Sequence, residues 1–271
     1  MSRARVNDVE LWYELKGSGP HLVQIGGAVS AHEGYATITD AMTEHFTVID
    51  YDHRGYGQSD RPQQRYTMAT WSDDLAGLLD AIGVERTHIH GGSMGGFIAT
   101  LFAARYPERV DRLVISGAIA KCDRMARTQF EVWKALARAY GTDSEELALE
   151  LSEKALSRPF LDESFGADAL QAIREVVARN VETAVFCDAC DAMIETDVTS
   201  ELGRIAAPTL LLCGEVDCLT PLDCGPDGVG MRRMAELIPG ARLHVFPGCG
   251  HGNLMERADE SIQVIVDFLK A

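Results

Sequence analysis

The chain alternates short apolar runs with longer stretches whose apolar residues recur every three to four positions. Apolar runs predict buried strands, and stretches with helical spacing predict amphipathic helices. The predicted strands of the first half cover 9–15, 21–27, 45–52, 86–92 and 110–118. The predicted helices between them cover 35–44, 67–84 and 94–107. Strands that alternate with helices indicate a mostly parallel central sheet flanked by helices, which is an α/β fold.

From about residue 121 to residue 200 the strand pattern stops and only helical spacing remains. Strand patterns return at 207–217 and 241–248, with further helices predicted at 231–238 and 258–271. We therefore expect two parts. Residues 1–119 and 201–271 would form the α/β core, and residues 120–200 would form an inserted helical cap.

Composition and charge narrow the class of partner. The chain has 271 residues, of which 46% are hydrophobic and 24% charged, as in an ordinary globular protein. A formal net charge of −16 argues against binding to nucleic acid or to an anionic membrane surface, since both recruit basic patches. We find no apolar run with the length of a membrane span or a signal peptide. Seven cysteines without a framework spacing indicate reduced thiols and a cytoplasmic location.

The stretch GGSMG at 91–95 places Ser93 between glycines, where a predicted strand meets a predicted helix. In that context G-x-S-x-G is typical of a nucleophile elbow, a strained turn that exposes the serine hydroxyl. The flanking glycines leave room for the turn, and the helix N-terminus faces any anion that forms nearby. We interpret Ser93 as a nucleophile rather than as part of a loose turn.

A serine hydroxyl needs a base, and the base needs an acid to orient it. In an open α/β sheet such residues lie on loops at the carboxyl ends of the strands. Asp217 follows one predicted strand and His251 follows the next, so the chain order is Ser, Asp, His. Asp223 and Asp227 are the alternatives for the acid. The other histidines lie in strands, on the surface or on loops without this order.

Attack on a carbonyl leaves an oxyanion that backbone N–H groups can stabilise. We expect one donor to be the N–H of Met94, directly after the nucleophile. The second would be the N–H of Gly27 or Ala28, in the loop GGAVSA that follows an early strand. The glycine-rich segment at 223–231 either shapes the pocket entrance or is a loop insertion without a role.

Four blocks of sequence resemble the α/β-hydrolase-fold family, in its group of cap-bearing esterases, lactonases and C–C hydrolases. They are the loop GGAVSA, the segment DYDHRGYGQSDRP (50–62), the elbow, and GEVDCLTP together with PGCGHGNLMERADE. The resemblance implies a catalytic triad of Ser93, Asp217 and His251. It also implies that the helical insertion covers the active site.

A serine at the elbow, where related epoxide-opening and halide-displacing enzymes have aspartate, argues against both of those reactions. Acyl chemistry and retro-Claisen cleavage of a C–C bond remain. Our leading hypothesis is a serine hydrolase that cleaves a small or medium apolar ester or lactone, because similar C–C hydrolases usually have more glycine in the oxyanion loop. A C–C bond hydrolase on the same triad, or a ligand receptor with a hydrolase fold, is the alternative.

The helical insertion is expected to set the substrate. Large apolar residues from this region are candidates for the substrate-binding wall: Met125, Phe130, Trp133 and Phe186. We expect no cofactor and no metal ion. The sequence leaves the oligomeric state open, a homodimer included.

Overall fold

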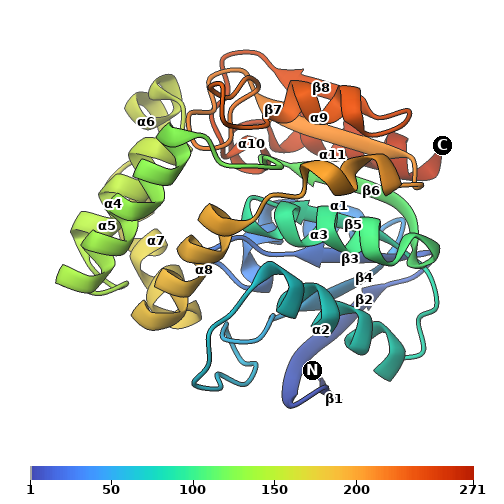
Figure 1. Ribbon diagram of the computed structural model, residues 1–271. Helices are drawn as coiled ribbons and strands as arrows, with labels where there is room; N and C mark the ends of the chain where they lie inside the picture. Colours follow the sequence, from blue (N-terminus) through green and yellow to red (C-terminus); the bar gives the residue numbers. More distant parts are fainter. Residues whose placement is uncertain (1) are drawn as a thin grey trace.

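The computed structural model describes residues 2–271 and places eight strands in one sheet, in the order β1-β2-β4-β3-β5-β6-β7-β8 (Figure 1). Strands β1 and β4 each pair with β2 antiparallel, and the remaining pairs are parallel. The strands are β1 (Ser2–Val6), β2 (Val9–Gly17), β3 (His21–Ile25), β4 (Thr47–Tyr51), β5 (Thr87–Gly92), β6 (Val110–Ser116), β7 (Thr209–Gly214) and β8 (Arg242–Phe246). The predicted α/β fold with a mostly parallel sheet is confirmed.

Helices flank the sheet on both faces and also form a separate group. The α-helices are α1 (Ala36–Thr43), α2 (Met68–Ala81), α3 (Met94–Arg105), α4 (Arg124–Tyr140), α5 (Glu145–Ala155), α6 (Arg158–Ser164), α7 (Ala167–Asn180), α8 (Thr183–Glu195), α9 (Met231–Leu237), α10 (Asn253–Glu256) and α11 (Ala258–Lys270). The 3₁₀ helices are η1 (His32–Tyr35), η2 (Pro107–Arg109) and η3 (Thr199–Arg204). None of the helices in the described part of the chain is both long enough and apolar enough to cross a membrane.

Alternate side chains of the central strands feed two hydrophobic cores. On β3, Val23 belongs to the core that includes α2 and α3, while Leu22 belongs to the core that includes α1 and α11. On β6, Ile115 and Val114 divide in the same way. Because successive side chains of a strand point to opposite faces, a strand covered on both faces needs an unbroken apolar run. This is the physical reason why the sequence pattern located these strands.

Helices α4 to α8 follow one another between β6 and β7 and gather on one side of the sheet (Figure 1). Helix α4 is amphipathic and buries Phe130 and Trp133, and the Trp133 ring packs on Phe186 of the neighbouring α8. Side chains of Asp123 and Ser144 cap α4 and α5 by accepting hydrogen bonds from N–H groups of the first turn. The exact domain boundaries stay a prediction.

The glycine-rich segment at 223–231 has a structural role at the base of this helical group. Val229 donates its N–H to the carbonyl of Lys121 at 3.0 Å, and Ala120 donates to the carbonyl of Val229 at 2.9 Å. Val198 in turn donates to Ala120 at 3.0 Å. The segment therefore ties together the two chain connections that join the helical group to the sheet. It contributes no side chain to the pocket described below.

Candidate active site

Ser93 sits in a strained turn between β5 and α3, with φ 54° and ψ −121°. The glycines of the pattern are sterically required. A Cβ at position 91 would lie 2.2 Å from the carbonyl oxygen of Gly95, and a Cβ at position 95 would lie 2.0 Å from that of Ile25. The N–H of Ser93 donates to the carbonyl of Ser116 at the end of β6, at 2.9 Å. The chain is therefore held in the conformation that the elbow pattern predicts.

Asp217 and His251 meet at the carboxyl edge of the same sheet. Asp217 lies just after β7, and its Oδ2 is 2.9 Å from Nδ1 of His251, which lies just after β8. The other oxygen, Oδ1, accepts backbone N–H bonds from Leu219 at 2.8 Å and from Thr220 at 2.9 Å. The acid is buried and held by several donors, so it fixes the orientation of the imidazole ring.

Thr220 is a part of this arrangement that sequence reasoning missed. Its hydroxyl donates to Oδ2 of Asp217 at 2.8 Å and lies 3.0 Å from Nδ1 of His251. The alternative acid Asp223 instead pairs with Arg232 at the surface. Spacing alone could not select Thr220, because threonine three residues after an aspartate is also an ordinary turn residue.

The pair shifts the proton affinities of both partners. Burial of the ring by itself lowers the pKa of His251, but the charge and the hydrogen bond of Asp217 outweigh it, so the pKa of His251 lies above its usual value. Burial by itself raises the pKa of Asp217, but His251 and Thr220 outweigh it, so the pKa of this carboxyl lies below its usual value. Nδ1 of His251 is engaged, which leaves Nε2 to exchange a proton.

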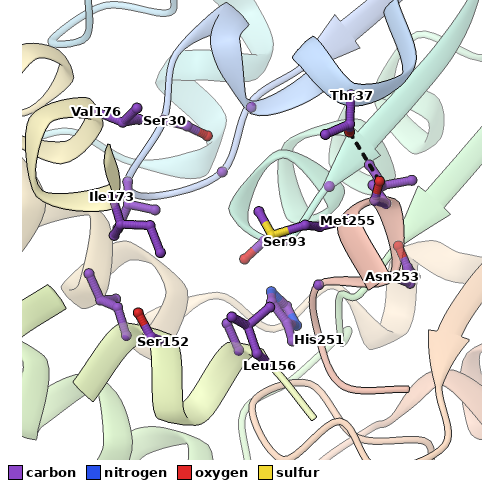
Figure 2. Close-up of a pocket in the computed structure, with 18 of the residues that line it drawn as sticks. Ser30, Thr37, Ser93, Ser152, Leu156, Ile173, Val176, His251, Asn253 and Met255 are labelled. Carbon is purple, nitrogen blue, oxygen red and sulfur yellow. Dashed lines mark hydrogen bonds between the residues drawn. The ribbon is translucent and has the colours of Figure 1, made fainter. Parts of the chain in front are cut away.

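Ser93 and His251 face the same cavity (Figure 2). In the described residues the hydroxyl of Ser93 makes no hydrogen bond to the ring; such bonds often tighten only when substrate is present. Gly117 brings the ring close to the sheet. Its φ is +52°, and a Cβ there would lie 3.0 Å from both Cε1 and Nδ1 of His251.

The expected oxyanion donors lie beside the nucleophile. Gly27 lines the pocket, and a Cβ at this position would approach Cβ of Ser93 to 3.4 Å and its Oγ to 3.8 Å. Ala28 lines the same pocket, and Met94 begins α3 directly after Ser93. The N–H groups that sequence analysis selected therefore belong to segments that converge at Ser93. Their role as oxyanion donors stays a prediction.

Tyr56 braces this corner from the segment 50–62. Its buried hydroxyl donates to the carbonyl of Ala28 at 3.0 Å and lies 3.9 Å from the sulfur of Met94. It therefore contacts both sides of the expected oxyanion site. The block DYDHRGYGQSDRP is one of the four that resemble the family, but the sequence alone did not single out Tyr56.

Two other histidines near the site, His32 and His90, form hydrogen bonds without lining the pocket. His32, directly after the expected oxyanion loop, places Nδ1 at 2.6 Å from Oδ1 of Asp52. His90 pairs through Nε2 with the hydroxyl of Ser116 at 2.7 Å, and burial lowers its pKa to about 3. Both pairs support the strand ends that carry the site, and neither ring lines the pocket.

The pocket has a volume of about 520 Å³ and lies between the carboxyl edge of the sheet and the helical group. Of the four expected substrate-binding residues, Trp133 lines it. Phe130 and Phe186 do not. They are buried and pack against Trp133, with ring centroids at 5.4 and 6.3 Å. Met125 is 69% exposed and lies outside the pocket, because α4 turns this position to solvent.

The helical group is joined directly to the loop of His251. Glu256 accepts, through Oε1, the N–H of Ser157 at 2.9 Å and that of Gly250 at 3.1 Å. Gly252 donates its N–H to the carbonyl of Ala155 at 2.8 Å. Residues on either side of His251 therefore contact the turn between α5 and α6.

Residues 20–258 match the family model described as alpha/beta hydrolase fold. The chain belongs to the α/β-hydrolase-fold family. Among solved structures, this hydrolase is similar to the enol-lactonase from Burkholderia xenovorans LB400, with a TM-score of 0.86, 26% identity and 100% of each chain covered. Hydrolysis is therefore the class of its reaction.

Two curated relatives indicate the type of substrate more closely than the family does. The hydrolase is 30% identical to a 2-hydroxy-6-oxo-6-phenylhexa-2,4-dienoate hydrolase of Comamonas testosteroni, over 100% of this chain and 94% of the relative. It is 32% identical to a 2-hydroxy-6-oxo-2,4-heptadienoate hydrolase of Pseudomonas putida, over 94% of this chain and 91% of the relative. The compounds in these names contain a ketone and no ester, so their hydrolysis breaks a C–C bond.

These relatives overturn the leading hypothesis of an ester or lactone substrate. That hypothesis relied on the low glycine content of the loop GGAVSA, which proved a poor guide to the reaction. The physical reason is that the loop presents backbone N–H groups, and these can stabilise the oxyanion of an ester or of a ketone equally. The C–C alternative fits better.

Proposed function

We propose that this α/β hydrolase cleaves the C–C bond beside the ketone of a 2-hydroxy-6-oxo-dienoate. The observation that carries the proposal is that Ser93 and His251 line one pocket and Asp217 pairs with His251, in a chain similar to two dienoate hydrolases over nearly its whole length. The apolar character of the pocket wall suits the carbon skeleton of a diene.

The reaction is a retro-Claisen cleavage of the ketonised substrate, in which C5 is a CH₂ group next to the C6 carbonyl. His251 takes the proton of Ser93 through Nε2, and Oγ attacks C6. The carbonyl electron pair moves onto oxygen, where the N–H of Met94 and that of Gly27 or Ala28 stabilise it. When the carbonyl re-forms, the C5–C6 bond breaks and its electron pair becomes a conjugated dienolate.

His251 then gives its proton to the dienolate, which leaves as a 2-hydroxydienoate. Water attacks the acyl group on Ser93 and loses a proton to the same nitrogen, and that proton returns to Oγ as the carboxylic acid departs. The sum adds one water molecule across the C5–C6 bond. Asp217 stabilises the imidazolium that forms in each half of the reaction.

The test is turnover of 2-hydroxy-6-oxo-6-phenylhexa-2,4-dienoate by the purified protein. We expect loss of the dienolate absorbance and formation of benzoate and 2-hydroxypenta-2,4-dienoate, with one oxygen of benzoate derived from labelled water. Ser93→Ala should lower kcat by roughly 10⁴-fold or more, because the nucleophile is lost.

Ester and lactone panels run beside this assay give the competing outcome. Rapid turnover of p-nitrophenyl esters or lactones, together with no C–C cleavage of the dienoate, would overturn the proposal.

A further inference from the structure

The pocket wall away from Ser93 and His251 is built mainly from apolar side chains of the helical group. Trp133, Leu156, Phe160, Ile173 and Val176 all line it. Figure 2 shows three of them, Leu156, Ile173 and Val176, across the cavity from Ser93 or beside His251. Serine hydroxyls add polar atoms to this wall without adding charge.

One lining side chain carries an acid. Glu33 lies on η1, just after the expected oxyanion loop, and its side chain is 26% exposed. Its Oε1 is 3.4 Å from Nη2 of Arg179 on α7, and its Oε2 is 3.8 Å from Nδ1 of His32. In the described residues Oε2 is buried and makes no hydrogen bond. Glu33 is therefore held at the seam between the sheet and the helical group, on the pocket wall.

No lysine or arginine is among the lining residues in the part of the chain that the structure describes. The nearby Arg179 is 61% exposed and pairs with Glu33. A second carboxylate on a dienoate would lose hydration in this pocket, meet no cation on its wall and add a charge of the same sign as Glu33, whose partner Arg179 is largely exposed to solvent. An apolar group in place of that carboxylate would gain free energy from burial.

We propose that this pocket selects dienoates whose ketone carries an uncharged apolar group, and that Glu33 rejects those that carry a second carboxylate. This selectivity rests on the proposed C–C hydrolysis. It combines an attractive apolar wall with a repulsive charge, which is how sites commonly separate similar ligands. The carboxylate of the dienoate itself is common to all such compounds, so it cancels when they are compared.

The test uses three ketones that share the dienoate end: 2-hydroxy-6-oxo-6-phenylhexa-2,4-dienoate, 2-hydroxy-6-oxo-2,4-heptadienoate and 2-hydroxy-6-oxononadienedioate. Values of kcat/KM are measured with the wild type and with Glu33→Gln. Values of Kd are measured with Ser93→Ala, and with Ser93→Ala combined with Glu33→Gln, so that selectivity is read without turnover. Glu44→Gln, a change at an exposed acid outside the pocket, is the matched control.

We expect the phenyl and methyl ketones to exceed the dioate by roughly tenfold or more in kcat/KM and in affinity. Glu33→Gln should improve the dioate by roughly fivefold and leave the phenyl ketone within about twofold, since only the like charge is removed. Glu44→Gln should leave the ratio unchanged. Circular dichroism and Tm confirm that the variants are folded.

Three results would overturn the inference: a dioate that is bound and cleaved as well as the phenyl ketone, an unchanged ratio in Glu33→Gln, or no binding of any of the three. Failure of the proposed function is recognised separately. If Kd keeps the expected order and responds to Glu33→Gln while no C–C bond is cleaved, the selectivity stands and the assigned reaction is wrong.

Discussion

The sheet edge and the helical group of this hydrolase contribute to one pocket in different ways. At the sheet edge, Asp217 and His251 are held by directional hydrogen bonds, and Ser93 is held by a strained backbone. The helical group contributes mostly apolar side chains to the pocket wall, such as Ile173 and Val176, and these side chains form no hydrogen bonds. Changes at the sheet edge should therefore alter the rate for every substrate, whereas changes in the helical group should alter the choice among substrates.

After the loss of Ser93 itself, the largest effect is expected for Asp217→Asn, which should lower kcat by roughly 10⁴-fold because the imidazole loses its orienting charge. It should also change the pH profile. In the wild type, kcat/KM falls as the pH drops through the raised pKa of His251, because the protonated ring is no base. Without Asp217 the burial of the ring remains, so this pKa falls and the acid limb moves to lower pH.

Turnover at high enzyme concentration and NMR titration of His251 check these two expectations. An acid limb at unchanged pH in Asp217→Asn would contradict the assignment of His251 as the base.

Gly117→Ala should lower kcat by roughly 10²-fold for all substrates, because the added methyl group meets the His251 ring and displaces it. Gly240→Ala is the matched control. Its φ of +69° is similarly strained, but no atom lies within 4 Å of the added Cβ. Both variants should lose stability, and only the first should lose rate. Equal rates for the two variants would show that the position of the ring is not critical.

Tyr56→Phe should lower kcat by about tenfold at most and change KM little, because one hydrogen bond to the carbonyl of Ala28 is removed. Tyr66→Phe removes a hydroxyl that donates to Pro62, away from the oxyanion loop, and should leave kcat unchanged. Steady-state kinetics of the two variants measure this difference in kcat. If both lose rate equally, the effect of Tyr56 is a general loss of packing.

The smallest effect is expected in the helical group. Ile173→Ala should lower kcat/KM for the phenyl ketone by roughly threefold to tenfold and for the methyl ketone less. The shorter side chain leaves less apolar surface on the pocket wall, and the phenyl group, being larger than the methyl group, loses more contact. Ile194→Ala, a partly buried isoleucine of the same helical group that does not line the pocket, is the control. Parallel loss for both ketones would contradict the proposed division between sheet edge and helical group.

The arrangement around Ser93 was predictable because its causes are local. Gly91 and Gly95 are required by backbone contacts within a few residues and by one neighbouring strand, so the elbow can be read from a five-residue pattern. Asp217 and His251 were predictable because the carboxyl ends of parallel strands share one edge. Their chain order then needed no knowledge of side-chain packing.

The pocket wall was not predictable in the same way. Phe130 and Phe186 were expected on the substrate-binding wall, but both are buried and pack against Trp133 instead of lining the cavity. The spacing of apolar residues tells which face of a helix is covered and not what covers it. The same limit explains why Met125, which is exposed to solvent, was wrongly placed on the pocket wall. The hydrolysed bond was wrongly chosen for a different reason, because the glycine content of the oxyanion loop does not distinguish an ester from a ketone.

The sequence by itself determined the α/β architecture, the strained turn at Ser93 and the order of the residues expected to act with it, because each depends on short-range backbone geometry. Only the tertiary structure decided that Tyr56 reaches Ala28, that Thr220 joins the Asp217–His251 pair and that Glu33 lies on the pocket wall. Those contacts join segments far apart in the chain, so they exist only once the sheet and the helices have packed together.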